Sequence, residues 1–398
     1  MRPRFEVADA LRAHWEPIDW SEGLNTWQKR TLKALKTSRT LALGGHIDRC
    51  DACGHLELSY NSCRNRHCPK CQGHEREKWI EARETGLLPV KYFHVVFTLP
   101  DKLNGLCMSH PKELYDLLFA TAWDVINTFS HDPKLPGART GMFAILHTWG
   151  QNLSLHPHLH CVLPAGGLTR EGKWKHSRGE GKFQFPVKAM SKVFRARYVE
   201  GVRLLAREKK WTVDKTMMES LFDTPWVVFA KQPFFSTQQV VEYLGRYTHK
   251  IAISNHQIKS ITENVVSFEW KDYRHGERKG IMSLTPQEFI RRFSLHILPK
   301  RFVRIRHYGI LSSTSKGDCL QKASKSLGVK SDPSLSEHPC HETMEQTTLA
   351  TALRVCPCCK KAAMKRILEF DRRGPPSSIL SCLTRQTKRL DTLPLLSR

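Results

Sequence analysis

Two histidines separated by one residue, His158 and His160, have the spacing of a metal-binding pair. In a β-strand, side chains two residues apart point to the same face, so these imidazoles would lie about 7 Å apart along the strand. There they could bind one divalent cation together. If a hairpin turns near residues 152–153, an antiparallel partner strand places His147 opposite His158 and supplies a third ligand. The alternatives for the third position are His94 and His156, and a polar sheet face without metal is the competing interpretation.

A second pair, Tyr243 and Tyr247, is four residues apart and would share one face of a helix. Spacing alone favours core packing, because Val240 extends the same apolar stripe. Together with the histidines, the pair indicates chemistry instead, since a tyrosine hydroxyl can attack a DNA phosphodiester that a bound cation polarises. The products would be a 5′-phosphotyrosine and a 3′-hydroxyl. Arg246 and Lys250 flank the pair as candidate DNA contacts.

Cysteines gather in two regions of the chain. Cys50-x2-Cys53 is followed by Cys68-x2-Cys71, and two such knuckles are typical of a tetrahedral thiolate site for zinc. We predict a structural Zn²⁺ site from these four residues, and the number of zinc ions in this region, one or two, is left open. Further candidate ligands in the same region are Cys63, His46 and His67. Near the C-terminus, Cys356 and Cys359 form another knuckle, which Cys340 and His341 could complete as a second zinc site; loose thiols are the alternative there.

Composition restricts the partner. The 398 residues include 63 Lys+Arg and 38 Asp+Glu, a net charge of +25, which indicates a polyanion and most often nucleic acid. The hydrophobic fraction of 40% is enough for a core. No apolar run reaches the ~18 residues of a membrane span, and the acidic residues near the start argue against a signal peptide. The 13 cysteines are therefore expected in a reducing compartment, as metal ligands or thiols.

The most basic segment, residues 289–317, contains no Asp or Glu. Aromatic residues interleave with its cations, as in grooves that bind single-stranded DNA. A solvated basic face over an aromatic core is the alternative. The candidate DNA-binding residues here are Arg291, Arg292, Arg301, Arg304 and Arg306, and the interleaved aromatic residues are Phe293, Phe302 and Tyr308.

The elements that must position these residues alternate between strands and helices. Period-two patterns predict strands at 92–99, 142–149, 156–163, 225–229, 251–254, 265–273 and 280–284. Helical patterns cover 112–129, 191–209, 237–249 and 286–295. Short loops between neighbouring strands favour an α+β domain with a largely antiparallel sheet.

At these motifs the sequence resembles the HUH endonuclease superfamily, and within it the two-tyrosine rolling-circle transposases of insertion sequences. The matching stretches are YNSCRNRHCPKCQ (60–72), FHVVFTLP (93–100), LHTWGQNLSLHPHLHCVLPAGG (146–167), YLGRYTHKIAISN (243–255) and FIRRFSLHILPKRFVRIRHYG (289–309). They span about residues 46–310. The C-terminal part, from 312 onwards, matches the family less well.

The resemblance implies an N-terminal zinc-binding domain and a ferredoxin-like catalytic core. It implies single-strand DNA cleavage and joining with Mg²⁺ or Mn²⁺. The motif residues carry over as His158 and His160 for metal and as Tyr243 and Tyr247 for nucleophiles. Related relaxases have a third histidine upstream of the pair, which supports His147. The implied location is the bacterial cytoplasm, with the protein on the nucleoid when it is bound to DNA.

We divide the chain into an N-terminal helical region (1–45), a zinc-binding domain with a connector helix (46–86), a catalytic domain (87–310) and a divergent basic C-terminal region (311–398). The predicted function is a transposase that nicks and rejoins single-stranded DNA at element ends and targets, without a membrane partner. The alternatives are a plasmid replication initiator or relaxase, which shares the chemistry, and a zinc-ribbon DNA-binding protein in which these histidines and tyrosines are structural.

Overall fold

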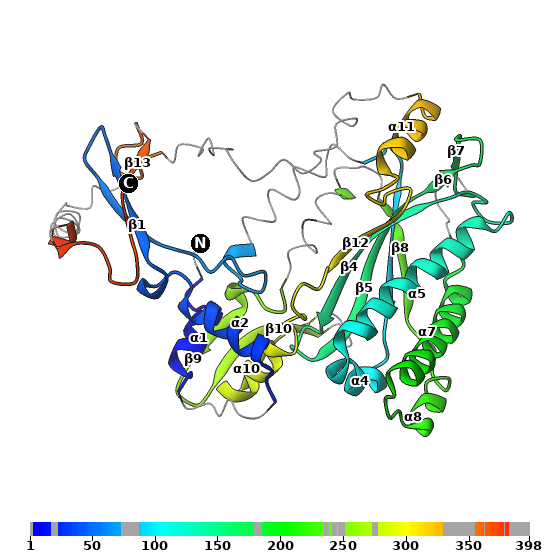
Figure 1. The fold of residues 1–398 in the computed structure, drawn as a ribbon, viewed down its shortest axis with the longest axis horizontal. Coiled ribbons are helices and arrows are strands. Elements are labelled where there is room, and N and C mark those ends of the chain that lie inside the picture. The colour runs from blue at the N-terminus through cyan, green and yellow to red at the C-terminus, as the bar shows by residue number, and fades with distance from the viewer. Residues whose placement is uncertain are drawn as a thin grey trace.

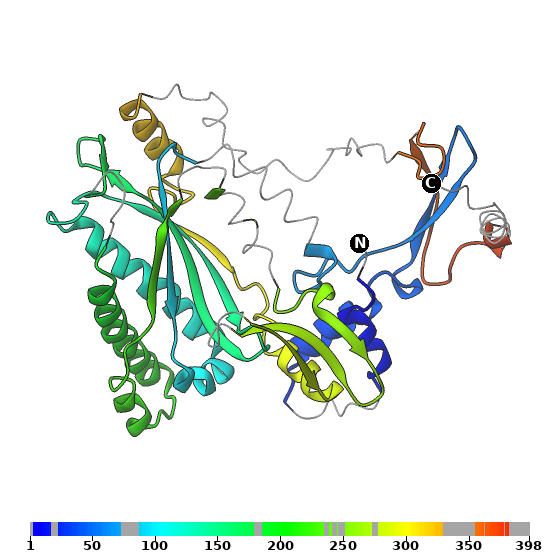
Figure 2. The same cartoon turned by 180° about the vertical axis from the view of Figure 1, so that it is seen from behind.

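The computed structural model shows three connected parts, seen from two sides in Figures 1 and 2. A sheet with long helices on one face is the largest part. Two N-terminal helices and a smaller sheet form the second, and a sheet that combines N-terminal with C-terminal residues forms the third. The structure describes residues 3–16, 23–72, 87–178, 185–234, 239–240, 245, 251–272, 278–328, 355–361, 363–377 and 379–381.

The largest sheet has five strands in the order β12-β4-β5-β3-β8, and every neighbouring pair is antiparallel. Its strands are β3 (Tyr92–Thr98), β4 (Gly141–Trp149), β5 (Leu155–Pro164), β8 (Val228–Phe234) and β12 (Ile305–Gly309). The strands expected at 92–99, 142–149 and 156–163 are confirmed to within one residue. The predicted α+β class with an antiparallel sheet is thus confirmed.

The two faces of this sheet differ because side chains alternate along each strand. On one face, Phe97, Leu146 and Cys161 belong to a core that includes the apolar residues of two long helices. These helices, α5 (Pro111–His131) and α7 (Val187–Lys209), lie together on that face in Figure 1. The shorter helices next to these two in the chain are η2 (Asp101–Leu103) and α4 (Asn104–Ser109), before α5, and α8 (Lys215–Ser220), after α7. The candidate metal-binding histidines therefore belong to the opposite face.

A second core joins the N-terminal helices to residues far along the chain. Leu11 and Leu32 from these helices are buried with Phe268 and Phe289. The indole of Trp27 donates to the Leu298 carbonyl at 3.0 Å. The elements of this part are α1 (Val7–Ala13), α2 (Thr26–Thr37), η3 (Asn255–Gln257), β9 (Ile258–Ile261), β10 (Val266–Asp272), β11 (Arg278–Leu284) and α10 (Pro286–Ser294). Helices α1 and α2 therefore share a core with residues assigned to the catalytic domain by sequence, and the predicted domain boundaries stay predictions.

The third part is small and is built from both ends of the chain. Its sheet has the order β13-β1-β2, from β1 (Gly45–Cys50), β2 (Leu56–Tyr60) and β13 (Met364–Phe370). The elements of the chain not yet named do not belong to this three-stranded sheet. They are η1 (Leu41–Leu43), β6 (Gly166–Leu168), β7 (Trp174–His176) and α11 (Lys316–Ser326). Figure 1 shows β1 and β13 side by side, away from the five-stranded sheet.

The strand predicted at 251–254 is wrong. The backbone there is irregular and leads into η3, because Ser254 and Gln257 cap this short turn through reciprocal side-chain hydrogen bonds. The helix predicted at 286–295 is confirmed as α10, where the Thr285 side chain accepts from the Glu288 N–H and Pro286 occupies the first turn. Among the described residues, no helix is both long and apolar enough to cross a membrane.

Candidate metal centres and nucleic-acid interface

Three histidines on the open face of the five-stranded sheet converge on one point. The ring nitrogens of His147, His158 and His160 that could bind a metal all lie within 4.8 Å of one another. The predicted register is confirmed, because β4 and β5 pair with His147 opposite His158. His147 and His160 are buried, whereas His158 is half-buried. The antiparallel pairing thus brings together the three imidazoles that the sequence singled out.

Hydrogen bonds orient two of these rings. His158 donates from Nδ1 to the carbonyl of His156 at 2.7 Å, which leaves Nε2 as the atom that would bind a cation. Nδ1 of His160 lies 2.9 Å from Nε2 of His94, on the neighbouring strand β3. If His160 donates in that contact, its Nε2 also becomes the ligand atom. A partner on the second nitrogen is the usual arrangement for metal-binding histidines.

Neither alternative for the third ligand belongs to this group. His94 is buried behind His160 and hydrogen-bonds to it, so its place in the structure suits orientation of the ring. The imidazole of His156 lies 3.7 Å from the carboxylate of Asp101. No local pattern indicates this role, because the contact depends on the pairing of β3 with β5.

The donor set can be tested against the expected cation. Three imidazoles supply only nitrogen, and first-row transition metals such as Mn²⁺ accept such ligands more readily than Mg²⁺ does. The remaining coordination positions would be left to water or phosphate oxygens. His147 also stacks on Trp149, with ring centroids 4.5 Å apart. The cluster therefore fits a divalent cation that keeps open positions for a phosphate.

The loop between β4 and β5 is held by the second core. Leu153 at its centre has φ of 61° and is fully buried there, a left-handed conformation that costs energy for a branched side chain. Nε2 of His296 donates to the Leu153 carbonyl at 3.1 Å, and Thr148 Oγ1 lies 3.2 Å from Nδ1 of the same ring. The loop that sets the register of the histidines is thus tied to residues that follow α10.

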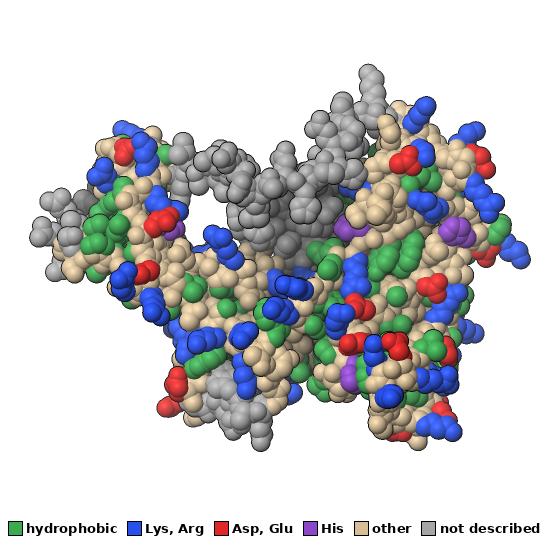
Figure 3. All heavy atoms as spheres, in the orientation of Figure 1, with side chains coloured by type: hydrophobic (Ala, Val, Ile, Leu, Met, Phe, Trp, Pro, Cys, Tyr) green, Lys and Arg blue, Asp and Glu red, His purple; other side chains and the backbone are tan. Residues whose placement is uncertain are grey.

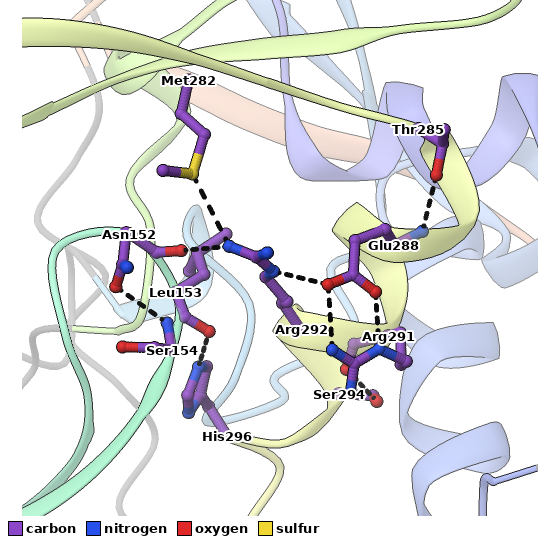
Figure 4. A network of polar contacts seen from close by, with 10 residues as sticks. All are labelled: Asn152, Leu153, Ser154, Met282, Thr285, Glu288, Arg291, Arg292, Ser294 and His296. Atoms are coloured by element: carbon purple, nitrogen blue, oxygen red, sulfur yellow. Dashed lines mark hydrogen bonds and ion pairs between the residues drawn. The ribbon is translucent and has the colours of Figure 1, made fainter. Parts of the chain in front are cut away.

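Arg292 forms a further link to this loop, as Figure 4 shows. Its Nη1 donates to the Asn152 carbonyl at 3.2 Å, and its Nε donates to Glu288 at 2.7 Å. Arg291 makes two hydrogen bonds to the same carboxylate, at 2.6 and 2.9 Å. These arginines lower the pKa of Glu288 to about 2, chiefly through the Arg291 hydrogen bonds. Arg291 and Arg292, two predicted DNA-binding residues, therefore pair with a carboxylate of the protein itself. This carboxylate, Glu288, directly precedes the segment 289–317, which contains no acidic residue.

The other cations of the basic segment lie in different settings. Arg306 pairs with Asp116 and lies over the ring of Phe119, 4.2 Å from its centroid. Arg304 is half-buried, and the desolvation of its guanidinium group lowers its pKa to about 10. Arg301 is exposed, with φ of 60°. DNA contacts by any of these arginines stay predictions.

Two of the three aromatic residues of this segment lie in the hydrophobic cores. Phe293 and Phe302 are each only 3% exposed and belong to the two hydrophobic cores. Tyr308 stacks on Trp123, with ring centroids 5.4 Å apart. Burial therefore excludes Phe293 and Phe302 as stacking platforms for DNA, whereas Tyr308 is half-buried.

A more open basic surface lies on the third part of the molecule. A groove of about 1260 Å³ is lined by residues of all three strands, among them His46 of β1, Tyr60 of β2 and Phe370 of β13. Tyr60 and Phe370 meet edge to face in its wall, with ring centroids 6.2 Å apart. The arginines that line it are Arg39, Arg64, Arg366 and Arg373. Two carboxylates line it as well, and they pair with arginines: Glu369 with Arg366 and Asp371 with Arg373. Figure 3 shows Lys and Arg side chains spread over this part as well as over the face of the larger domain.

The cysteines group differently from the predicted arrangement. Cys50 and Cys53 lie with Cys356 and Cys359, whereas Cys68 and Cys71 lie with Cys63. The predicted single site of Cys50, Cys53, Cys68 and Cys71 is therefore corrected to two groups. Regular knuckle spacing predicted the ligand type, but it carries no information about a partner knuckle about three hundred residues away.

The remaining sequence candidates lie outside these groups. His46 lies 3.7 Å from the carboxylate of Asp48, and His67 is buried with its Nε2 accepting from Arg66 Nε at 3.3 Å. Neither is part of a described metal-binding group. Tyr243, Tyr247, Arg246 and Lys250 lie outside the described residues, as do Cys340 and His341.

Comparison with known proteins agrees with this combination of features. A family model described as "Putative transposase" matches residues 141–318, and one described as "Transposase zinc-binding domain" matches residues 10–99. The putative transposase y4qJ of Sinorhizobium fredii (strain NBRC 101917 / NGR234) is 41% identical over 388 residues, which cover 93% of this chain and 97% of that protein. The transposase for insertion sequence element IS801 of Pseudomonas savastanoi pv. phaseolicola is 28% identical over 331 residues, 79% of this chain and 77% of that protein. No solved structure matches.

The two family models thus identify a transposase with an N-terminal zinc-binding domain. The chain belongs to the IS91 family of insertion-sequence transposases. The matched zinc-binding domain and the cysteine groups support Zn²⁺ as a cofactor.

Replacing Arg292 with Met should loosen the loop that carries Asn152. We expect a loss of about 1–3 kcal/mol in the free energy of unfolding, because hydrogen bonds from a charged donor are lost. Thermal or urea unfolding measures this change. Lys300→Met, at an exposed position, is the control. Equal stability of the two variants would contradict the role of Arg292.

Burial lowers the pKa of His296 from 6.5 to about 4. Between these values the unfolded chain binds a proton that the folded chain does not, so stability falls as pH falls. This residue alone should account for a loss of about 2 kcal/mol between pH 7.5 and pH 5. Urea unfolding at both pH values should show a weaker pH dependence in His296→Gln. The exposed-site variant His176→Gln should behave like the wild type, and equal slopes in all three proteins would refute the assignment.

Proposed function

We propose that this transposase nicks and rejoins single-stranded DNA at the ends of its element through a 5′-phosphotyrosine intermediate, in a rolling-circle type of transposition. The observation that carries the proposal is the convergence of His147, His158 and His160 on one point. A divalent cation, Mg²⁺ or Mn²⁺, would act there as a Lewis acid on the scissile phosphate. The names of the relatives favour an insertion-sequence enzyme over a plasmid initiator or relaxase.

The nucleophiles in this proposal are Tyr243 and Tyr247. Val240, three positions earlier in the sequence, is fully buried in a cluster with Ile145 and Val162. Ile145 lies opposite His160 in the sheet, and Val162 follows two residues later on β5, on the same face. Val240 thus packs on the histidine face, which supports the assignment of the two tyrosines that follow it in the sequence.

In the cleavage step, the tyrosine oxygen forms a bond to phosphorus and the bond between phosphorus and the 3′-oxygen breaks. The phenol loses its proton, and the leaving 3′-oxygen takes one up. Because the phosphoester is conserved, a 3′-hydroxyl can reverse the step and join strands without ATP. A second tyrosine would allow one strand to remain bound while another is cut. Such an enzyme would act on the bacterial nucleoid, in the cytoplasm.

A labelled oligonucleotide that carries an element end tests the reaction. With Mn²⁺ or Mg²⁺, a 3′-end label should migrate with the protein on a denaturing gel, whereas a 5′-end label should appear on a shortened free strand. His158→Ala or His160→Ala should reduce adduct formation ~100-fold or more, because phosphate polarisation is lost. His156→Ala is the matched control on the same strand. An unchanged adduct in both ligand variants would contradict the metal site, and an unchanged adduct in the double variant Tyr243→Phe/Tyr247→Phe would contradict the nucleophiles.

We expect His94 to affect the reaction only by strengthening the binding of the cation to His160. Replacing it with Phe removes the hydrogen-bond partner of His160 and should weaken cation affinity by about 10–100-fold. The Mn²⁺ concentration for half-maximal adduct formation should rise accordingly, while the rate at saturating Mn²⁺ recovers to near the wild-type value. A variant whose deficit persists at saturating Mn²⁺ would show that His94 does more than orient His160.

A further inference from the structure

The group formed by Cys50, Cys53, Cys356 and Cys359 unites the two ends of the chain. Cys50 Sγ lies 3.6 Å from Cys359 Sγ, across 309 positions of sequence, and Cys53 Sγ lies 3.7 Å from Cys356 Sγ. A zinc–sulfur bond of about 2.3 Å places two sulfurs of a tetrahedral site roughly 3.8 Å apart. The observed distances therefore match those of a thiolate site and are far longer than a disulfide bond.

The two knuckles have the same local backbone geometry. In the first, the Gly54 N–H donates to the Cys50 carbonyl at 2.9 Å; in the second, the Lys360 N–H donates to the Cys356 carbonyl at 3.0 Å. The residue after the second cysteine is left-handed in both, with φ of 70° at Gly54 and 56° at Lys360. For Lys360 this conformation is unfavourable by itself. Two matching turns thus present four thiols to one centre.

The sheet around the group extends this connection. β13 pairs antiparallel with the whole of β1, from Gly45 opposite Phe370 to Cys50 opposite Met364. Lys365 forms an ion pair with Asp51 at 2.5 Å. Among the described residues, the buried hydrophobic side chains next to the thiols are Cys50, Cys356 and Met364, and β1 adds the buried Ile47. So few apolar side chains cannot stabilise a separate module, which is the usual reason for a structural metal.

We propose that one Zn²⁺ ion, bound by Cys50, Cys53, Cys356 and Cys359, fastens the C-terminal segment 355–370 to the N-terminal zinc-binding domain. The domain is therefore discontinuous in sequence, and residues 10–99 alone do not complete it. Cys63, Cys68 and Cys71 form a separate group and do not take part in this site. Because Arg366 and Phe370 line the basic groove described above, the same zinc ion also holds one wall of that groove in place.

Cys358 provides a matched control. It lies inside the C-terminal knuckle but is exposed and does not belong to the four-cysteine group. The test uses full-length protein and measures zinc per chain by elemental analysis, together with the visible thiolate spectrum after Co²⁺ substitution. The double variant Cys356→Ser/Cys359→Ser should contain one zinc equivalent less than the wild type, and Cys358→Ser should contain the same amount. An unchanged zinc content in the double variant would overturn the proposal, as would an equal loss in Cys358→Ser.

A second measurement separates loss of the site from general unfolding. In Cys50→Ser/Cys53→Ser, hydrogen exchange should become fast at the amides of β13, although these substitutions lie about three hundred residues away. The amides of β4 and β5 should keep their protection, which shows that the five-stranded sheet is folded. If β13 stays protected, or loses protection only together with β4 and β5, the zinc ion does not fasten this segment. Neither readout depends on DNA cleavage, so the proposed transposase reaction can fail or succeed independently.

Discussion

The antiparallel register of β4 and β5 is the constraint on which the candidate active site depends. Pairing His147 with His158 puts three imidazoles on one face of the sheet, while the intervening residues enter the core beneath α5 and α7. A slip of one residue would turn the histidines of one strand toward that core. The fully buried Leu153 prevents such a slip, because the loop is anchored in a different hydrophobic core. The small N-terminal core thus contributes to the geometry of a site to which it supplies no ligand.

The sequence predicted the parts of the site that depend on local patterns. Alternation along the strand predicted that His158 and His160 share a face, and the length of the hairpin was enough to predict the position of His147. The sequence could not predict the pairing of β3 with β5, which brings the His94 ring to the His160 ring. That pairing depends on long-range packing, which a local pattern does not contain. The nucleophile assignment at Tyr243 and Tyr247 stays a prediction, because these residues lie outside those described.

Two interpretations failed for the same reason, which is that local sequence does not reveal a distant partner. The knuckles at Cys50 and Cys68 look like one zinc site in sequence, yet a C-terminal strand adds to the sheet beside the first. Phe293 and Phe302 look like stacking platforms for DNA in the sequence, but they pack in hydrophobic cores with residues distant in the chain, whereas DNA contacts by the neighbouring arginines stay predictions.

The central claim is that His147, His158 and His160 bind one divalent cation through nitrogen. Pulsed electron paramagnetic resonance of Mn²⁺ bound to the full-length protein tests this directly, because a coordinated imidazole couples its nitrogen nuclei to the metal. The account predicts nitrogen couplings in the wild type and in His156→Ala, and weaker couplings in His160→Ala. Bound Mn²⁺ whose spectrum shows only water and phosphate couplings would contradict it.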